Sequence, residues 1–257
     1  MNIQQPKREN ILGVGVSAIN MQQALETIHA WITHRKPHYV CVTPAHSIMA
    51  CYHDPGLRPI FNRSGLTTPD GMSIVWILRL LGHKHVKRVY GPDLMHALCQ
   101  TSIMHGYRHY FYGGAPGLVD DLEDRLKTAY PGLSVVGSHT PPFGSVSQEE
   151  EEWIKDHIQA AKPDILWVGI SSPRQEIWMA EHVEILNVPV LIGVGAAFDF
   201  LSGRKKQAPR WIQRSGLEWL YRLASEPKRL WRRYAQYPHF LLLLLAQVMG
   251  LKKFPIE

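Results

Sequence analysis

A carboxylate in the stretch "TTPDGM" (residues 67–72) is the first side chain that could carry chemistry. Asp-Gly is among the commonest turn dipeptides, so a tight turn alone would account for Asp70. At the mouth of an α/β sheet, however, a carboxylate can remove the proton from an incoming hydroxyl, provided that it lies within hydrogen-bond reach of that nucleophile. The stretch therefore leaves two interpretations of Asp70, a turn residue and a general base.

Glycines in the stretch "GGAPG" (residues 113–117) suit the binding of a phosphate or diphosphate. Gly113 and Gly114 let the backbone approach a ligand closely, and the helix expected after them would present unpaired N–H groups to an anion. A tight turn with no ligand explains the same residues. The stretch does not match the spaced glycines of the dinucleotide fingerprint, and no nucleoside triphosphate loop ending in Gly-Lys-Ser/Thr occurs.

The stretch "SSPRQE" (residues 171–176) offers polar groups at an expected helix start. Gln175 has a bidentate amide suited to a nucleobase or a sugar hydroxyl, and Glu176 can accept hydrogen bonds. A capping arrangement, with Ser172 at the N-cap and Gln175 three residues later, would explain the glutamine without any ligand. Both interpretations stay open.

Metal catalysis has little support in the sequence. Neither Asp-x-Asp nor His-Glu-x-x-His occurs, and Cys41, Cys51 and Cys99 show no metal or disulfide spacing. The three thiols are expected to be buried in a reducing compartment. We therefore predict no metal site and no cofactor.

The elements that must position these residues alternate along the chain. Expected strands alternate with helices of 10–15 residues, which predicts an α/β fold with a Rossmann-like, mostly parallel sheet and helices on both faces. The strands are expected at 11–19, 38–43, 107–114, 133–139, 163–171 and 188–195, with a short one before the Gly-Pro turn at 91–92. The helices are expected at 21–32, 45–62, 118–130, 147–162 and 172–186, after a turn within 66–82, and after residue 92.

Ligands of such sheets bind at the carboxyl ends of the strands. This rule selects five loops as candidate sites: 43–46 with Thr43 and His46, 91–93 with Asp93, 113–117, 171–176 and 193–199. Residues 1–208 are expected to form the Rossmann-like domain, and residues 209–257 a basic, amphipathic helical appendage.

Positive charge is concentrated at the end of the chain. The net charge is +6, yet residues 201–257 hold 12 Lys and Arg against 3 Asp and Glu, so the preceding 200 residues are slightly acidic. A local basic patch indicates an anionic partner, which can be a phosphate, a lipid head group or a nucleic acid.

The leucine run "FLLLLLAQVM" (residues 240–249) beside this charge favours a membrane surface. Ten residues are far fewer than the ~20 that a spanning helix needs. Leucine and tryptophan beside arginine suit a helix lying in the interface, and they fit lipid better than a phosphate backbone, so no nucleic acid is expected. The alternative is that the leucines pack on the main domain or a second subunit while the arginines are solvated. Pro227 is expected in the first turn of a helix.

The motifs taken together resemble the WecG/TagA/CpsF glycosyltransferases (glycosyltransferase family 26). The resemblance runs in order from about residue 11 to 240 through "TPDGMSIVW", "RVYGPDLM", "FYGGAPG", "YPGLSVVGSH", "PDILWVGISSPRQEIWMAE", "IGVGAAFDFLSGRKKQAPRW" and "GLEWLYRLASEPKRLWRRY". It implies transfer of a sugar from a UDP-sugar to a hydroxyl of a polyprenyl-diphosphate-linked saccharide, at the cytoplasmic face of a bacterial membrane. It also implies inversion of the anomeric carbon and no need for a metal, with the UDP-sugar as co-substrate.

The resemblance also assigns roles by position. Asp70 matches the catalytic base, Thr43 a residue lining the pocket, and the loops around Gly113 and Gln175 the nucleotide-sugar side. The appendage arginines that close over the diphosphate match Arg222, Arg229 and Arg232.

One departure concerns the Thr-x-Asn pattern of many family members. Ala45 stands where the asparagine would be, so its contact is absent or is supplied by His46.

Two other functions remain compatible with the residues. A Rossmann-like sheet could serve a nucleotide-dependent oxidoreductase, but no acidic residue closes the strand expected at 133–139 to bind a ribose. A non-catalytic membrane scaffold for polysaccharide assembly would leave Asp70 dispensable. Without an apolar segment at its N-terminus the chain is expected in the cytoplasm, peripherally bound to the inner face of the cell membrane. A homo-oligomer is compatible with the sequence, and the donated sugar, the acceptor and the linkage are open.

Overall fold

The computed structural model describes residues 6–142, 144 and 146–256. Their contacts divide the chain into two compact units, each built from separate segments. Unit one contains residues 22–41 and 91–206, and unit two contains residues 6–21, 42–90 and 207–256. The expected boundary between residues 1–208 and 209–257 stays a prediction.

The sheet confirms the predicted α/β fold. Six strands follow the order β4-β3-β8-β7-β5-β6. The pairs β3 with β8, β8 with β7, β7 with β5 and β5 with β6 are all parallel. Parallel strands that are covered on both faces are apolar throughout, as β7 ("ILWVG") and β8 ("VLIG") are.

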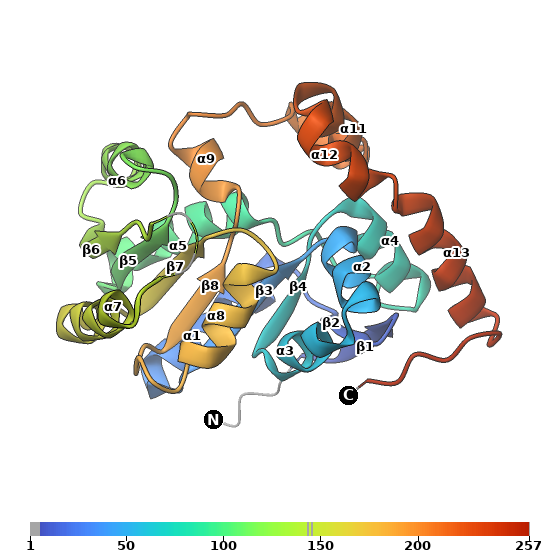
Figure 1. The fold of residues 1–257 in the computed structure, drawn as a ribbon, viewed down its shortest axis with the longest axis horizontal. Coiled ribbons are helices and arrows are strands. Elements are labelled where there is room, and N and C mark those ends of the chain that lie inside the picture. Colours follow the sequence, from blue (N-terminus) through green and yellow to red (C-terminus); the bar gives the residue numbers. More distant parts are fainter. Residues whose placement is uncertain (1–5, 143, 145, 257) are drawn as a thin grey trace. The chain divides into compact units, whose positions relative to one another are not determined.

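Unit one holds most of this sheet and its flanking helices. Figure 1 shows α6, α7 and α8 around the strands β5 to β8. The strands are β3 His38–Thr43, which passes into unit two after residue 41, β5 Arg108–Gly113, β6 Ser134–His139, β7 Ile165–Gly169 and β8 Val190–Gly193. The helices are α1 Met21–His34, α5 Gly91–His105, α6 Leu118–Ala129, α7 Gln148–Ala161, α8 Arg174–His182 and α9 Ala197–Leu201.

The prediction of a single strand at residues 11–19 is wrong. Residues 11–19 do not form one strand of the parallel sheet, because the chain reverses at Leu12 and Gly13, whose φ angles are +53° and +88°. Positive φ at both central residues is the geometry of a two-residue hairpin turn. The strands β1 Arg8–Ile11 and β2 Val14–Ser17 therefore pair antiparallel in a separate sheet.

The segment 66–90 also differs from the prediction. Residues 66–69, expected as a turn, form the buried strand β4 Leu66–Pro69, and α4 Met72–Leu80 follows a glycine with φ +82°. The described residues 86–90 do not form a strand. Val89 makes one backbone hydrogen bond to β4, from its N–H to the carbonyl of Pro69, and its carbonyl accepts from the side-chain hydroxyl of Thr68. Gly91 and Pro92 begin α5 instead of forming a turn, and Pro is favoured at such a position.

The helix expected at 45–62 is broken at Asp54, whose side chain accepts from the N–H of Gly56. The result is α2 Ala45–His53, the 3-10 turn η1 Pro55–Leu57 and α3 Arg58–Arg63.

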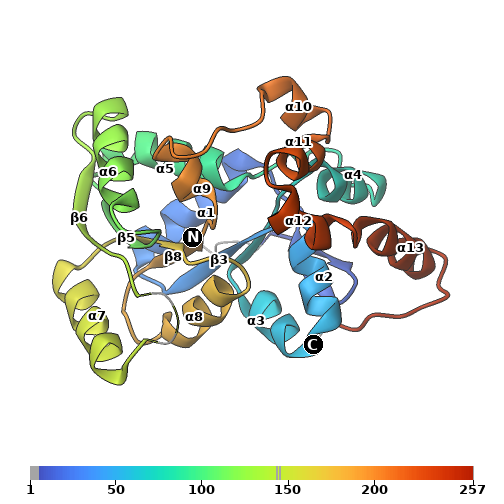
Figure 2. The same ribbon diagram turned by 45° about the horizontal axis from the view of Figure 1, so that its top comes forward.

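The C-terminal helices of unit two follow one another in short pieces. They are α10 Arg210–Arg214, α11 Glu218–Ser225, α12 Pro227–Tyr234 and α13 Tyr237–Val248, and Pro227 lies in the first turn of α12 as predicted. Figure 2 shows α11, α12 and α13 in succession with α2 beside them. Phe240 and Leu243 of α13 are buried, and α13 contacts α2. One face of the leucine run therefore packs on the protein.

Candidate active site

Asp70 lies where β4 ends in unit two. Its backbone N–H donates to the carbonyl of Thr43 at 3.3 Å, which joins the carboxyl ends of β4 and β3. Gly71 then takes a φ of +82° that glycine adopts without strain, and α4 begins at the next residue. The Asp70 side chain is 14% exposed, so it is largely enclosed yet open to solvent. Both interpretations of the Asp-Gly pair therefore meet here, since the residue forms a turn and also presents a carboxylate at the sheet edge.

Arg88 is the immediate partner of this carboxylate. Its Nε donates to Asp70 Oδ1 at 2.9 Å, and its NH1 lies 2.6 Å from Glu218 Oε2 at the start of α11. Burial acts to lower the pKa of Arg88, but the charges of Asp70 and Glu218 raise it overall, so the guanidinium stays charged. One cation thus links the sheet edge to the C-terminal helices.

Tyr90 lies beneath this cation. The Arg88 guanidinium carbon is 3.9 Å from the centre of the tyrosine ring, a cation–π geometry. Tyr90 is 4% exposed, and among the described residues its hydroxyl has no hydrogen-bond partner. Burial, followed by the charges of Glu218 and Asp70, raises the pKa of Tyr90, so the hydroxyl keeps its proton.

A cationic cluster adjoins these residues. Burial, together with the charges of Arg233 and Arg222, lowers the pKa of His46 well below its ordinary value, so the imidazole is neutral at neutral pH. Burial also lowers the pKa of Arg233, and the neighbouring charge of Arg222 lowers it further. Two guanidiniums and a neutral imidazole are therefore brought together from α2, α11 and α12.

The three predicted arginines differ in their partners and exposure. Arg222 belongs to the cationic cluster, whereas the exposed Arg229 is paired with Glu226 at 2.6 Å. Arg232 is exposed, and its guanidinium lies 5.5 Å from the ring centre of Trp231. Arg233, which was not among the predicted contacts, lies near enough for its charge to lower the pKa of His46. The spacing of residues 222, 229 and 233 hinted at it, but the helix breaks between residues 225 and 227, so spacing alone could not decide.

Thr43 and Ala45 lie at the start of this site. Thr43 is fully buried at the end of β3, and Ala45, at 2% exposed, is the first residue of α2. The position where many family members have asparagine is thus filled by a methyl group, and the neighbouring His46 carries the only polar side chain of the stretch 44–46.

The glycine stretch belongs to unit one. Gly113 ends β5 with a φ of +119°, and a Cβ there would lie 2.6 Å from the backbone of Gly169 on β7. Gly114 has a φ of +80°, and its N–H donates to the carbonyl of Gly169 at 3.0 Å. The glycines therefore serve a close approach of two strand ends, which by itself explains part of the motif.

Gln175 and Glu176 lie inside unit one. The Gln175 amide oxygen accepts from the N–H of Gly195 at 3.0 Å, and its NH2 donates to Glu176 Oε1 at 2.9 Å. Both residues are buried, and burial raises the pKa of Glu176. The capping interpretation is wrong, because the N-cap of α8 is Pro173 and no side chain caps it. Gln175 therefore positions the loop after β8.

Two further features bear on an anion near the glycine stretch. The first turn of α6 carries Asp120 and Asp121, which already complement the positive end of the helix dipole. Arg204 pairs with Asp121 at 2.7 Å and donates to the carbonyl of Pro116 at 3.2 Å, so a cation lies on the loop. The predicted residue Asp93 lies in the first turn of α5, half-buried.

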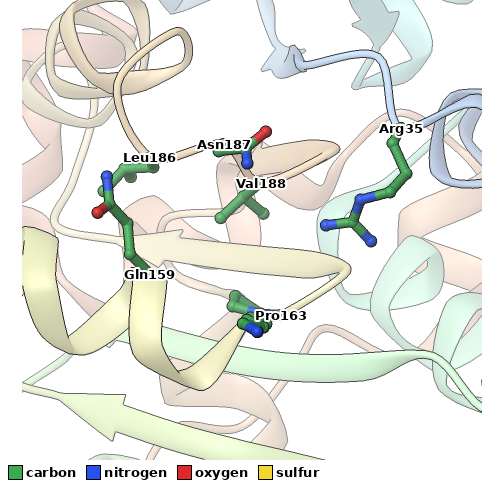
Figure 3. Close-up of a pocket in the computed structure, with 7 residues that line it drawn as sticks. Arg35, Gln159, Pro163, Leu186, Asn187 and Val188 are labelled. Atoms are coloured by element: carbon green, nitrogen blue, oxygen red, sulfur yellow. The ribbon is translucent and has the colours of Figure 1, made fainter.

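A cavity of about 260 Å³ lies at the opposite edge of the unit-one sheet, where β7 and β8 begin. Figure 3 shows its lining side chains, and Arg35 and Lys162 supply two cations. Asp164, in contact with Arg35 at 3.3 Å, offsets part of that charge. Ligands of parallel sheets bind at the other edge, so we do not place the candidate site here.

The three cysteines are buried free thiols, as predicted. In residues 6–142, 144 and 146–256, no group of three or more His, Cys, Asp or Glu side chains could hold a metal ion. Over the same residues, no helix is both long enough and apolar enough to cross a membrane.

Comparison with known proteins finds one matching family and similar proteins of known activity. Residues 9–254 match the model of the glycosyl transferase WecG/TagA/CpsF family. An N-acetylglucosaminyldiphosphoundecaprenol N-acetyl-beta-D-mannosaminyltransferase of Bacillus spizizenii (strain ATCC 23059 / NRRL B-14472 / W23) is 30% identical over 192 residues, which cover 75% of this chain and 72% of the relative. A protein of the same name from Bacillus subtilis (strain 168) is 27% identical over 195 residues, covering 76% of this chain and 74% of the relative.

Proposed function

Because the chain belongs to the WecG/TagA/CpsF family of glycosyltransferases, we propose that it transfers a sugar from a UDP-sugar to a saccharide carried on polyprenyl diphosphate. The observation that carries this proposal is the arrangement in unit two. A carboxylate at the sheet edge, Asp70, is linked through Arg88 to the same C-terminal helices that supply the cations Arg222 and Arg233.

Asp70 is proposed as the general base. Its Oδ1 accepts from Arg88, while the carboxylate keeps lone pairs for the proton of an acceptor hydroxyl. The hydroxyl oxygen attacks the anomeric carbon as the bond to UDP breaks, and the proton passes to Asp70. Attack from the face opposite the leaving group inverts the anomeric carbon.

Inversion is supported by the names of the relatives. They are described as forming a β-linked mannosaminyl product. Since the common UDP-sugars are α-linked, a β-linked product requires inversion. The same names give N-acetylglucosaminyl-diphosphoundecaprenol as their acceptor, and we propose an acceptor of this class for the present chain.

The cationic cluster is proposed to stabilise diphosphate charge. The charge of Arg222 lowers the pKa of Arg233, a repulsion between two guanidiniums that an anion between them would relieve. Fixed positive groups aimed at developing charge lower the barrier without a metal ion. We therefore propose metal-independent transfer with these guanidiniums in the place of a divalent cation. The donor is proposed to bind through the loops at Gly113 and Gln175.

Membrane binding is proposed through the outer face of α13. Five exposed apolar side chains lie opposite the buried Phe240 and Leu243, four on α13 and one just after it; they are Leu241, Leu242, Leu245, Val248 and Met249. The unpacked face of the leucine run is thus available to lipid, which suits a helix lying in the interface. Exposed cations flank it at Lys228, Arg232 and Lys253, and each would add roughly 1 kcal/mol at an anionic surface.

The helix after the proposed base extends this apolar character. On α4 and just beyond it, Trp76, Leu80 and Leu81 are exposed, Leu80 by 87%. Trp76 lies against Gly216, where a Cβ would come within 2.6 Å of the indole, so α4 and the loop before α11 form one surface. A base near a membrane-bound surface would meet an acceptor whose lipid stays in the bilayer.

The proposal is tested by offering the purified protein a panel of UDP-sugars, beginning with UDP-N-acetylmannosamine, together with N-acetylglucosaminyl-diphosphoryl undecaprenol. Product mass identifies the sugar, and NMR of the product gives the anomeric configuration. Parallel reactions with EDTA measure the need for a metal. We expect one UDP-sugar to give a β-linked product with EDTA present. No product with any UDP-sugar would remove the proposal, and an α-linked product would remove the inverting mechanism.

A further inference from the structure

The hydroxyl of Tyr90 is a costly feature of unit two. In the part of the chain that the structure describes, it is enclosed and unbonded, although the phenol ring is held in place by Arg88. A buried polar group without a partner loses the hydrogen bonds it had in water. Phenylalanine would keep the ring and its contact with Arg88 without that loss. A function for the hydroxyl is therefore needed to explain tyrosine here.

The charges around Tyr90 indicate what the hydroxyl could bind. Asp70 and Glu218 are the anions that act on it, and Arg88 and Arg222 are the cations. Their formal charges cancel, in contrast to the cluster at His46, where both charged neighbours are arginines. A balanced environment favours a neutral, oxygen-rich group over a diphosphate. A saccharide has such oxygens, and Asp70 is the proposed base for a saccharide hydroxyl.

We propose that Tyr90 is a substrate-contacting residue whose hydroxyl donates a hydrogen bond to an oxygen of the acceptor saccharide. This inference rests on the proposed function, since it takes the acceptor to be a lipid-linked sugar. The acceptor supplies the hydrogen-bond partner that the free protein lacks. The new bond strengthens acceptor binding because the hydroxyl is already desolvated and rigid before the acceptor arrives. Tyr90 thereby acts on recognition of the sugar, whereas the guanidiniums act on the diphosphate charge that develops during transfer.

The test is Tyr90→Phe, measured with the full chain. For N-acetylglucosaminyl-diphosphoryl undecaprenol we expect kcat/KM to fall about tenfold to a hundredfold, the range that one lost hydrogen bond to a now unpaired oxygen gives. The melting temperature of the variant should equal or exceed that of the wild type, because a buried unbonded hydroxyl is removed. Kinetics within twofold of the wild type would overturn the inference.

Tyr110→Phe is the matched control in unit one. Tyr110 is fully buried, but its hydroxyl is bonded to His157 Nδ1 at 2.7 Å. Removing this made hydrogen bond should lower the melting temperature and leave the acceptor KM unchanged. If Tyr90→Phe lowers the melting temperature as much as Tyr110→Phe does, the Tyr90 hydroxyl has a structural partner and the inference is wrong.

A binding measurement tests whether Tyr90 contacts the sugar or the diphosphate of the acceptor. It also distinguishes a failure of this inference from a failure of the proposed function. Wild type and Tyr90→Phe are titrated with the lipid-linked sugar and with undecaprenyl diphosphate, which has no sugar. We expect weaker binding of the variant to the first ligand only, and an equal loss for both would assign Tyr90 to the diphosphate and overturn the inference. Should the wild type bind the sugar but transfer nothing, the selective loss would still support Tyr90 as a saccharide contact while the transferase proposal fails.

Discussion

The guanidinium of Arg88 lies 2.6 Å from the carboxylate of Glu218, and this ion pair joins the segment after α4 to the first turn of α11. Both side chains are largely enclosed, at 15% and 12% exposed. Arg88 also bonds to Asp70, so the pair fixes the cation that touches the proposed base. The C-terminal helices are thereby tied to the sheet edge by one residue.

Glu218→Gln should weaken the interaction between Arg88 and the first turn of α11. Loss of a charged partner to an enclosed guanidinium is expected to lower the free energy of unfolding by about 1.5–3 kcal/mol, measured by urea titration, and to lower kcat as Arg88 becomes less well positioned beside Asp70. Glu226→Gln is the matched control, because its pair with Arg229 is more exposed and worth at most about 1 kcal/mol. Equal effects of the two variants would contradict the role given to Glu218.

Asp70→Asn should remove the general base while keeping the fold. Arg88 retains Glu218 but loses its other charged partner, so we expect the melting temperature to fall by no more than it does in Glu218→Gln. Turnover at saturating acceptor should fall by roughly 10²–10⁴. Asp54→Asn, at the exposed cap of the turn after α2, serves as the control for the same chemical change. Near-normal turnover of Asp70→Asn would exclude the carboxylate as the base, and it would favour a non-catalytic role for the site.

Replacing Leu241, Leu242 and Leu245 by Gln should weaken binding to vesicles of phosphatidylglycerol. These side chains are exposed, so the fold should persist, and each removes apolar area worth roughly 25 cal/mol per Å² buried in lipid. Co-sedimentation with the vesicles measures the change. The control replaces Ile103 and Met104, exposed apolar residues of α5 in unit one. If the control weakens binding as much as the leucine variant, α13 is not the specific contact.

Removal of residues after 208 should leave little transferase activity, because this segment carries the arginines proposed to bind the substrate. The structure adds a second expectation. Phe240 and Leu243 of α13 are buried, α13 contacts α2, and Gln247 bonds to Leu12 and Asn10 of the hairpin, so truncation also uncovers part of the core of unit two. We therefore expect a lower melting temperature. Limited proteolysis should cut unit two first, and a fully active truncated protein would contradict both expectations.

Glu176→Gln should stabilise the protein at high pH. Burial raises the pKa of Glu176 above its ordinary value of 4.5, so the folded state favours the protonated acid. The stability that this proton provides is fully present when the pH is below the pKa of Glu176 in the unfolded chain. It is lost as the pH rises through the pKa of Glu176 in the folded protein, and the loss is about 1.4 kcal/mol for each unit by which the two pKa values differ. The variant lacks this loss, so its advantage in melting temperature should grow from pH 4.5 to pH 8. Glu181→Gln, at an exposed position of the same helix, should show no such trend, and a flat difference for Glu176→Gln would contradict the assignment.

Much of the fold was predictable because local patterns determine it. Apolar segments such as 38–43 and 165–169 form strands in any context that buries them, and the alternation with helices predicts a parallel sheet. Short segments were mispredicted where the backbone conformation of one residue determines the direction of the chain. Leu12 adopts a positive φ that its type disfavours, and its N–H is held by Gln247 from the far end of the chain.

The sequence by itself determined the fold class, the family and the carboxylate at position 70. Only the tertiary structure showed that Arg88 pairs with both Asp70 and Glu218, and that Arg222 and Arg233 are the arginines whose charges act on His46. It also showed that the Tyr90 hydroxyl is buried and has no hydrogen-bond partner among the described residues. The physical reason is that motifs record residue types and spacing along one chain. Electrostatic pairing and desolvation depend on distances between segments remote in sequence, and these are set when the helices pack.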